Sequence, residues 1–346
     1  MAATSYTKAL TRTLPEPRGP LSSAVITALA QGIPSERLTL PDIDQTDPYG
    51  EDLMLALYVC YELHYRSFAG VDPIWEWEPR LLGLRAAMER IFLAALRSDA
   101  GSHGDSVDDV ATALDALLVE QVPGNGVSHY LWKYAQWWQM REYIVHRSVY
   151  HLKEADPHAW VIPRLQGQAK AALVAVEFDE FGSGRGERVH AQLFADLMVA
   201  VGLSPDYLHY LDDVPAPAIA IVNMMSMFGL HRRLRGAMVG HFAAAEITTP
   251  PSARRITRAL ERLGAGPVCT LFFTEHVEAD AVHEQVLRRD VIGDLLRREP
   301  HLAADVVFGI GATGLLEARL ADHLLNAWRA GTTSLRRPLP ENAGPG

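Results

Sequence analysis

His276, Asp280 and His283 are spaced four and then three residues apart in a segment with helical composition. An α-helix advances about 100° per residue, so these side chains would project from one stripe of its surface. Two imidazoles and a carboxylate on one stripe can bind a metal ion, although an exposed polar face gives the same pattern. The apolar residues 269–273 just before the stripe favour burial. We therefore interpret the stripe as half of a metal site.

Two further segments place polar ligands where the apolar side of a helix is interrupted. Glu154 ends an aromatic-rich segment, and Glu180 ends an alanine-rich one. His190 lies beyond the glycine-broken stretch 182–186 that follows Glu180. Taken alone, Glu154 is better explained as a solvated helix-end residue. Helical metal sites, however, use carboxylates and histidines that project inward from facing helices, and these three residues would complete such a site.

The combined set contains carboxylates and imidazoles only: Glu154, Glu180, His190, His276, Asp280 and His283. Oxygen and nitrogen donors in this proportion suit two iron or manganese ions. They do not suit a zinc site built on thiolates or a calcium site built on oxygen alone. The residue types therefore predict a site for two transition-metal ions.

The same spacings resemble those of the haem-oxygenase-like diiron oxygenases, a family of iron-containing redox enzymes. The likeness rests on the Glu154 to Glu180 spacing, on Asp-Glu-Phe-Gly followed by His190, and on Phe-Thr-Glu-His-x3-Asp-x2-His at 273–283. It is closest to the metal-binding domain of N-nitrosating enzymes and their N-oxygenase relatives. The resemblance implies a haem-oxygenase-like helical bundle in which the six residues bind two Fe ions (Fe2+/Fe3+), with O2 as co-substrate.

On this resemblance we expect a non-haem diiron oxygenase that oxidises a small amine- or amino-acid-like metabolite, by N-oxygenation in a biosynthetic pathway. Relatives with the same ligands carry out oxidative C–C cleavage or desaturation of an amino acid or fatty acid, so that alternative stays open. Glu187-x-x-His190 also imitates a ferritin-like motif, which would indicate an iron-handling protein without oxygenase activity. The glycines before Glu187 argue against one continuous ferritin-type helix, and Glu187 is kept as an extra ligand that could swing onto iron. A helical interaction module with an incidental His/Asp pattern is the remaining alternative.

Other polar residues in helical segments have a structural explanation. Glu142 and His146 lie one helical turn apart and are expected to form an ion or hydrogen-bond pair. Glu62 and His64 would point about 200° apart on a helix, so they cannot share a metal ion. The apolar residues 224–228 are expected in the core, where they could also wall a substrate cavity.

Helical periodicity without sustained alternation predicts an all-α fold. The expected helices cover 21–31, 51–68, 80–97, 107–122, 130–154, 164–179, 187–202, 216–246, 252–263 and 268–289, followed by two more. We divide the chain into an N-terminal arm (1–47), a haem-oxygenase-like helical domain (48–331) and a polar tail (332–346). The metal-binding core would cover about 130–290, and extra N-terminal helices would precede it.

The composition limits the partners. The formal net charge is −10 and there is no block of basic residues, which argues against nucleic acid. No apolar run reaches the roughly 18 residues of a membrane span, and residues 1–20 lack the features of a signal peptide. With Cys60 and Cys269 alone, no disulfide framework is expected and a cytoplasmic location fits. We expect a small-molecule substrate, a homodimer and an external electron donor.

Overall fold

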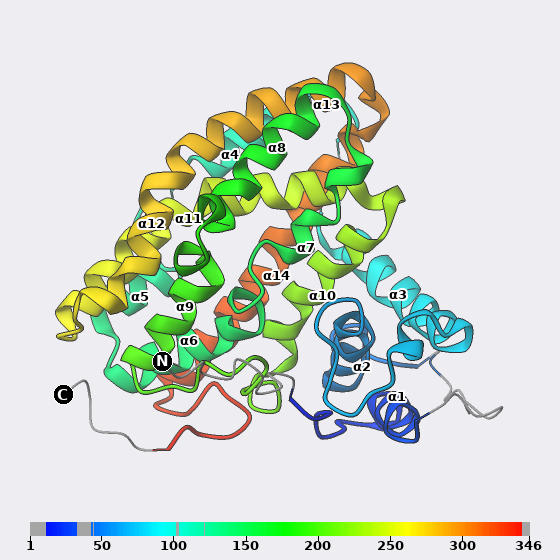
Figure 1. The fold of residues 1–346 in the computed structure, drawn as a ribbon. Helices are drawn as coiled ribbons and strands as arrows, with labels where there is room; N and C mark the ends of the chain where they lie inside the picture. The colour runs from blue at the N-terminus through cyan, green and yellow to red at the C-terminus, as the bar shows by residue number, and fades with distance from the viewer. Residues whose placement is uncertain (1–11, 33–42, 44, 102–103, 121, 341–346) are drawn as a thin grey trace, which may run out of the picture.

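The chain folds into helices joined by short turns (Figure 1). The computed structural model describes residues 12–32, 43, 45–101, 104–120 and 122–340, with the backbone alone for 278–282, and no strand occurs among them. The helices are α1 Pro20–Ala30, α2 Glu51–Glu62, α3 Pro79–Asp99, α4 Val107–Leu117, α5 Val127–Tyr134, α6 Trp137–His151, α7 Asp156–Ala159, α8 Gly167–Glu180, α9 His190–Ala200, α10 Ala216–Leu230, α11 Arg235–Arg262, α12 Pro267–Gln285, α13 Gly293–Arg298 and α14 Ala303–Arg329. A π-helical segment, Val286–Ile292, continues α12. The predicted all-α fold is confirmed.

The centre of the fold is α11, which packs against both α12 and α14. The α11–α14 crossing is close because glycines face each other's backbone. A Cβ atom at Gly240 would lie 2.1 Å from the carbonyl oxygen of Val306, and one at Gly309 would lie 2.0 Å from that of Ala237. Only residues without a side chain fit at this distance. The close crossing therefore determines which side chains of α11 and α14 point into the interior of the protein.

The N-terminal helices α1, α2 and α3 lie together on the side away from α12 (Figure 1). The first of them is tied to the second by Asp52, whose carboxylate accepts hydrogen bonds from the backbone N–H groups of Leu21 and Ser22. Leu21, Val25 and Leu29 of α1 are buried. The described part of the predicted arm is thus packed onto the helices that follow it.

The helix predicted over 130–154 is interrupted. Ala135 and Gln136 have extended backbone between α5 and α6. Gln139 closes the start of α6, because its side chain accepts a hydrogen bond from the Gln136 backbone N–H. The guanidinium of Arg262 donates to the carbonyl of Ala135 and to two others at the end of α5. A residue more than 120 positions away thus stabilises the break, which local periodicity could not reveal.

The helices predicted over 216–246 and 252–263 have different boundaries in the structure. The first breaks at His231, where Arg164 donates to the final carbonyls of α10 from another part of the chain. The second joins the end of the first, because α11 continues through Pro250 and Pro251. Proline lacks the N–H that would bond to the carbonyl four residues earlier. The packing of α11 on its neighbours outweighs that loss.

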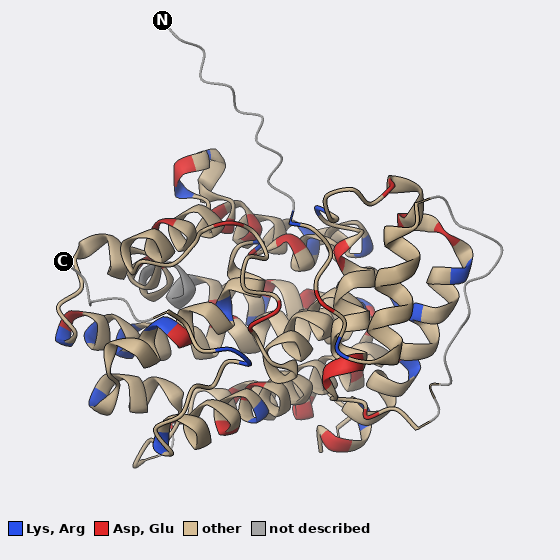
Figure 2. Cartoon of the chain, turned by 90° about the horizontal axis from the view of Figure 1, so that it is seen from below, with Lys and Arg blue, Asp and Glu red and all other residues tan. Residues whose placement is uncertain are grey.

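One helical segment, Pro300–Arg329, is long and apolar enough to cross a membrane by length and composition. The sequence had suggested that no run would reach this length. Of its most apolar stretch, 56% is buried inside the protein, where α14 packs against α11 and α10. This burial is that of a core helix. On the helices seen from below, Lys and Arg are interspersed with Asp and Glu (Figure 2).

The residues expected to serve structure do so. Met224, Met227 and Phe228 are fully buried in the core. Glu142 accepts hydrogen bonds from the Trp328 indole and from Ser334, and His146 is bonded to the Ser334 hydroxyl. In the described structure no hydrogen bond or ion pair joins Glu142 to His146, so the expected pair is not formed; both side chains instead bond to Ser334 and hold the chain that follows α14 against α6.

Candidate metal centre

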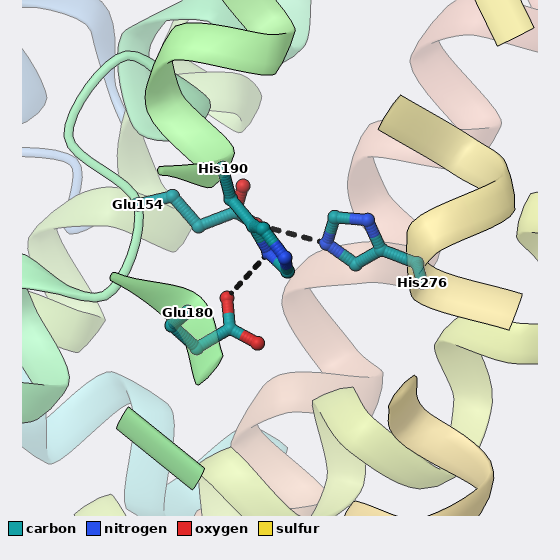
Figure 3. A group of neighbouring side chains, drawn as sticks. All are labelled: Glu154, Glu180, His190 and His276. Carbon is teal, nitrogen blue, oxygen red and sulfur yellow. Dashed lines mark ion pairs between the residues drawn. The ribbon is translucent and has the colours of Figure 1, made fainter. Parts of the chain in front are cut away.

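Four buried side chains from different segments converge on one point (Figure 3). Glu154 lies in the turn after α6, Glu180 is the last residue of α8, His190 is the first residue of α9, and His276 lies in α12. Each offers a ligand atom, and these atoms lie within 4.8 Å of one another. We call these residues the first group.

The turn between α8 and α9 brings Glu180 and His190 together. Gly182 has a φ of +69°, and a Cβ there would lie 2.6 Å from the backbone of Arg188. A glycine is therefore needed for the chain to reverse so tightly. Arg188 forms an ion pair with Glu275, the residue before His276. The turn that carries His190 is thus tied to α12.

Buried ion pairs fix the position of Glu154. The preceding residue, Lys153, lies 2.8 Å from the carboxylate of Glu62, which also accepts a hydrogen bond from Tyr207. The Glu154 carboxylate itself lies 2.8 Å from Nδ1 of His151. Burial alone would raise the pKa of Glu154, but His151 and His276 outweigh burial and hold the pKa well below its usual value. Glu154 is therefore an anion, as a metal ligand must be.

The hydrogen bonds of the first group leave ligand atoms facing one another. His276 Nδ1 lies 2.7 Å from the Phe272 carbonyl, which can only accept, so a neutral His276 has its lone pair on Nε2. That Nε2 lies 3.6 Å from the Glu154 carboxylate. Glu180 lies 2.8 Å from His190 Nδ1, but without hydrogen-bond geometry. Ligand atoms that face one another in a buried site are stabilised by a positive charge between them, which a proton on the imidazole or a metal ion can supply.

A second group lies beside the first and consists of Glu180, Glu246 and His283, also buried and within the same distance. His283 Nδ1 lies 3.0 Å from Glu246 and 4.0 Å from Glu180. Burial would lower the pKa of His283, but the hydrogen bond with Glu246 and the nearby carboxylates raise it to about 9. Burial raises the pKa of Glu246, although the hydrogen bond with His283 opposes the shift. Without a metal ion, a proton therefore occupies the space between these ligands.

Glu180 belongs to both groups. A carboxylate has two oxygens and can bind two metal ions at once, so the arrangement suits a pair of ions with Glu180 between them. The donors are oxygen and nitrogen without sulfur, and buried ligand atoms of Glu154, Glu180 and His190 lack a hydrogen-bond partner among the described residues. This chemistry fits iron.

Five of the six predicted ligands are placed in these two groups. The side chain of Asp280 lies outside the described residues, so its role stays a prediction. Glu187 is exposed in the turn before His190 and belongs to neither group. Because Glu187 and His190 do not share a helix, the ferritin-type motif is not formed.

Glu246 was missed in the sequence. It follows an apolar run in α11, at the end of the segment predicted as a helix. An acidic residue that interrupts the apolar side of a helix is the same signal that singled out Glu180. Applied to this segment, the signal would have found both Glu246 and His241.

A cavity of about 540 Å³ opens beside the two groups. Glu154, Glu180, His276 and Glu246 form part of its wall. Much of the remainder is apolar, with Met225, Phe242, Phe272, Phe273, Ile310 and Leu324 among the lining residues. A small molecule held here would lie next to the candidate metal ligands and largely out of water.

Comparison with known proteins agrees with this geometry. Residues 141–318 match the family model described as iron-containing redox enzyme. The chain is also similar to nitrosourea synthase from Streptomyces achromogenes subsp. streptozoticus, with 27% identity over 173 residues. That match covers 49% of this chain and 36% of the relative, so the chain spans well under half of the relative's length. All residues of both groups lie within the family match.

Proposed function

Since this chain belongs to the family of iron-containing redox enzymes, and is thus an oxidoreductase, we propose that it is a non-haem diiron oxygenase. It would oxidise a small molecule held in the cavity beside Glu154, Glu180 and His276. The observation that carries the proposal is the sharing of Glu180 by two buried groups of ligands. One ion would lie among Glu154, Glu180, His190 and His276. The other would lie among Glu180, Glu246 and His283, with Asp280 as the further ligand that the resemblance implies.

The chain's own residues would prepare the site for oxidation. Bound iron would supply the electrons that activate O2. The Phe272 carbonyl holds the His276 ring with Nε2 toward the site, and the Lys153–Glu62 pair anchors the backbone next to Glu154. The apolar wall around Phe242 and Phe272 would shield the reacting molecule from water on that side. These residues would bind and orient, while the ions carry the redox chemistry.

We propose N-oxygenation of an amine- or amino-acid-like metabolite as the reaction. The support is the similarity to nitrosourea synthase, whose name indicates a product with an oxidised nitrogen. The ligands themselves do not distinguish this reaction from oxidative C–C cleavage or desaturation. Mass spectrometry of products formed under ¹⁸O₂ separates the two. Labelled oxygen on nitrogen is expected, whereas an alkene or a lost one-carbon fragment would replace the proposed reaction by the alternative.

The metal site is tested by anaerobic loading with Fe(II) followed by metal analysis. We expect about two irons per chain, and a clear loss in His276→Ala, because removal of a buried ligand weakens binding at that ion. Oxygen consumption by the loaded protein is then screened against amines, amino acids and fatty acids. Iron well below two per chain, unchanged by the substitution, would remove the diiron proposal. Loading with many irons as a mineral would indicate storage instead.

The homodimer and the external electron donor are part of the same proposal. Sedimentation of the iron-loaded protein tests the first, with a mass of twice the 38.1 kDa chain expected. Turnover that stops after one cycle without a reductant, and resumes when one is added, supports the second. Sedimentation as a monomer would contradict the homodimer. Sustained turnover without a reductant would contradict the external electron donor.

A further inference from the structure

A second set of polar residues faces the cavity and takes no part in either group of metal ligands. It consists of His158 in α7, His241 in α11, Thr313 and Glu317 in α14, and Arg147 in α6, and all of them line the cavity. The His158 and His241 side chains are 2% and 1% exposed. We call this set the imidazole cluster.

The hydrogen bonds of Thr313 determine which nitrogen of His241 carries the proton. The Thr313 hydroxyl has one proton, which it donates to the Gly309 carbonyl at 2.7 Å. The same hydroxyl lies 2.8 Å from His241 Nδ1, so it must accept there, and Nδ1 carries the proton. In a neutral imidazole the other nitrogen is then an acceptor. His241 Nε2 is buried and has no hydrogen-bond partner among the described residues.

His158 adds two more polar atoms. Neither Nδ1 nor Nε2 of His158 has a hydrogen-bond partner in the described part of the chain. Its ring is stacked on Phe242, with 4.2 Å between ring centroids and 18° between planes, and lies 5.3 Å from the His241 ring. The stack holds the ring in place without satisfying its nitrogens. A neutral imidazole offers one donor and one acceptor, so the two rings together offer donors and acceptors to a ligand.

The imidazole cluster carries no net charge. Arg147 and Glu317 form a bidentate ion pair, with both N–O distances at 2.7 Å. Burial lowers the pKa of His158 well below its usual value, and burial lowers the pKa of His241 to about 4 although Glu317 opposes the shift. Both imidazoles are therefore neutral near pH 7. The Arg147–Glu317 pair is half-buried, and a charged ligand group beside the neutral imidazoles would have to break this ion pair or remain without a partner of opposite charge.

Buried polar atoms without partners are rare in proteins, because each loses its bonds to water. Three such nitrogens belong to two neighbouring rings whose residues line one cavity, and they indicate a ligand that bonds to them. We propose that His158 and His241 form a subsite for an uncharged hydroxyl or carboxamide group of the substrate. An N–H or O–H of that group donates to His241 Nε2, and its oxygen accepts from His158. This inference rests on the proposed function only in naming the ligand as the substrate of the oxygenase.

The test measures binding of four probes that share a six-carbon chain: 1-hexanol, hexanamide, hexanoate and hexylammonium. Calorimetric titration is carried out without oxygen, on both the iron-loaded and the metal-free protein. We expect the two uncharged probes to bind at least roughly tenfold more tightly than the charged ones. Equal binding of all four probes, or preference for a charged one, would overturn the inference.

Two substitutions test the roles of the residues. His241→Phe keeps a ring of similar shape but removes the acceptor, so the preference for uncharged probes should fall roughly tenfold. Thr313→Val no longer fixes the proton on Nδ1 and should reduce the preference by a smaller factor. His209→Phe, at an exposed histidine outside the cavity, should leave it unchanged. An unaltered preference in His241→Phe would exclude the subsite.

The midpoint of thermal unfolding provides a second measurement. If His241 had a purely structural role, its substitution would lower this midpoint. Because His241→Phe removes a buried acceptor without a partner, its midpoint of thermal unfolding should rise while probe binding weakens. If iron binds normally but the probe preference is absent, this inference fails by itself. If the preference is present but iron does not bind, the diiron proposal fails by itself.

Discussion

Glu180 is the residue on which both groups of ligands depend, and its position combines several local features. It ends α8, the glycine turn returns His190 to it, and both of its oxygens face imidazoles. Glu246 belongs only to the second group and comes from a different helix. We therefore expect substitutions of the two glutamates to remove different amounts of bound iron.

Glu246→Ala should reduce bound iron from about two to about one per chain, because only one ion would lose a ligand. Glu261→Ala on the exposed side of the same helix is the matched control and should retain both irons. Metal analysis after anaerobic loading measures the difference. Full occupancy in Glu246→Ala would show that Glu246 is not a ligand.

Glu177 lies one turn before Glu180, is 2% exposed, and has no hydrogen-bond partner for either oxygen among the described residues. Burial raises the pKa of Glu177 well above its usual value of 4.5, and Glu180 and Glu246 add to the shift. The folded protein thus holds this proton more tightly than the unfolded chain. The stability that Glu177 contributes is complete below pH 4.5 and is lost as the pH rises through the raised pKa.

Glu177→Gln removes this titration. At pH 7, the metal-free variant should be more stable than the wild type by about 1–3 kcal/mol, and the difference should vanish below about pH 4. Urea unfolding at a series of pH values measures it. A variant that is less stable at pH 7 would show that an ionised Glu177 has a stabilising partner.

At the scale of elements, the α11–α14 crossing determines the cavity. One helix supplies Glu246 and His241, and the other supplies Thr313 and Glu317. The facing glycines hold the helices close enough for the His241–Thr313 hydrogen bond. Loosening the crossing should therefore affect both stability and the cavity.

Gly240→Ala places a methyl group 2.1 Å from the Val306 carbonyl oxygen. The helices must separate, and we expect a loss of about 1–3 kcal/mol in the free energy of unfolding. Gly83→Ala in α3 is the control, since nothing lies within 4 Å of its Cβ, and it should gain about 0.5–1 kcal/mol. Equal effects of the two substitutions in urea unfolding would contradict the role given to the crossing.

At the scale of the whole molecule, buried neutral histidines make the fold sensitive to acid. Burial lowers the pKa of His241 to about 4 and lowers that of His158 below its usual 6.5, so unfolding allows both to take up protons. The stability that they contribute is complete above pH 6.5 and is lost as the pH falls toward 4. Other groups titrate in the same range, so the contribution of His241 must be isolated by substitution.

His241→Phe should flatten the pH dependence of stability between pH 6.5 and 4. We expect the wild type to lose about 2–3 kcal/mol more than the variant over this range. Chemical unfolding of the metal-free proteins at each pH gives the two curves. Parallel curves would mean that His241 is already protonated at neutral pH or stays neutral in acid.

The sequence by itself determined the class of the fold and most of the candidate ligands. Helical periodicity depends on local backbone geometry, and it predicted the all-α fold together with the residues His276 and His283 on one face of α12. Glu154, Glu180 and His190 were found because a polar residue in an apolar segment requires a partner. Both signals depend only on residues within a few helical turns of one another.

Only the tertiary structure decided how these segments meet. It placed Glu180 in both groups, added Glu246, interrupted the helix at Ala135 and carried α11 through Pro250. It also fixed the proton of His241 through Thr313, which lies 72 residues away. Each of these depends on contacts between segments far apart in the chain, and no local pattern encodes which helix faces meet. The types of the ligand residues could therefore be predicted from the sequence. The sharing of Glu180 and the uncharged imidazole cluster are determined by how the helices pack.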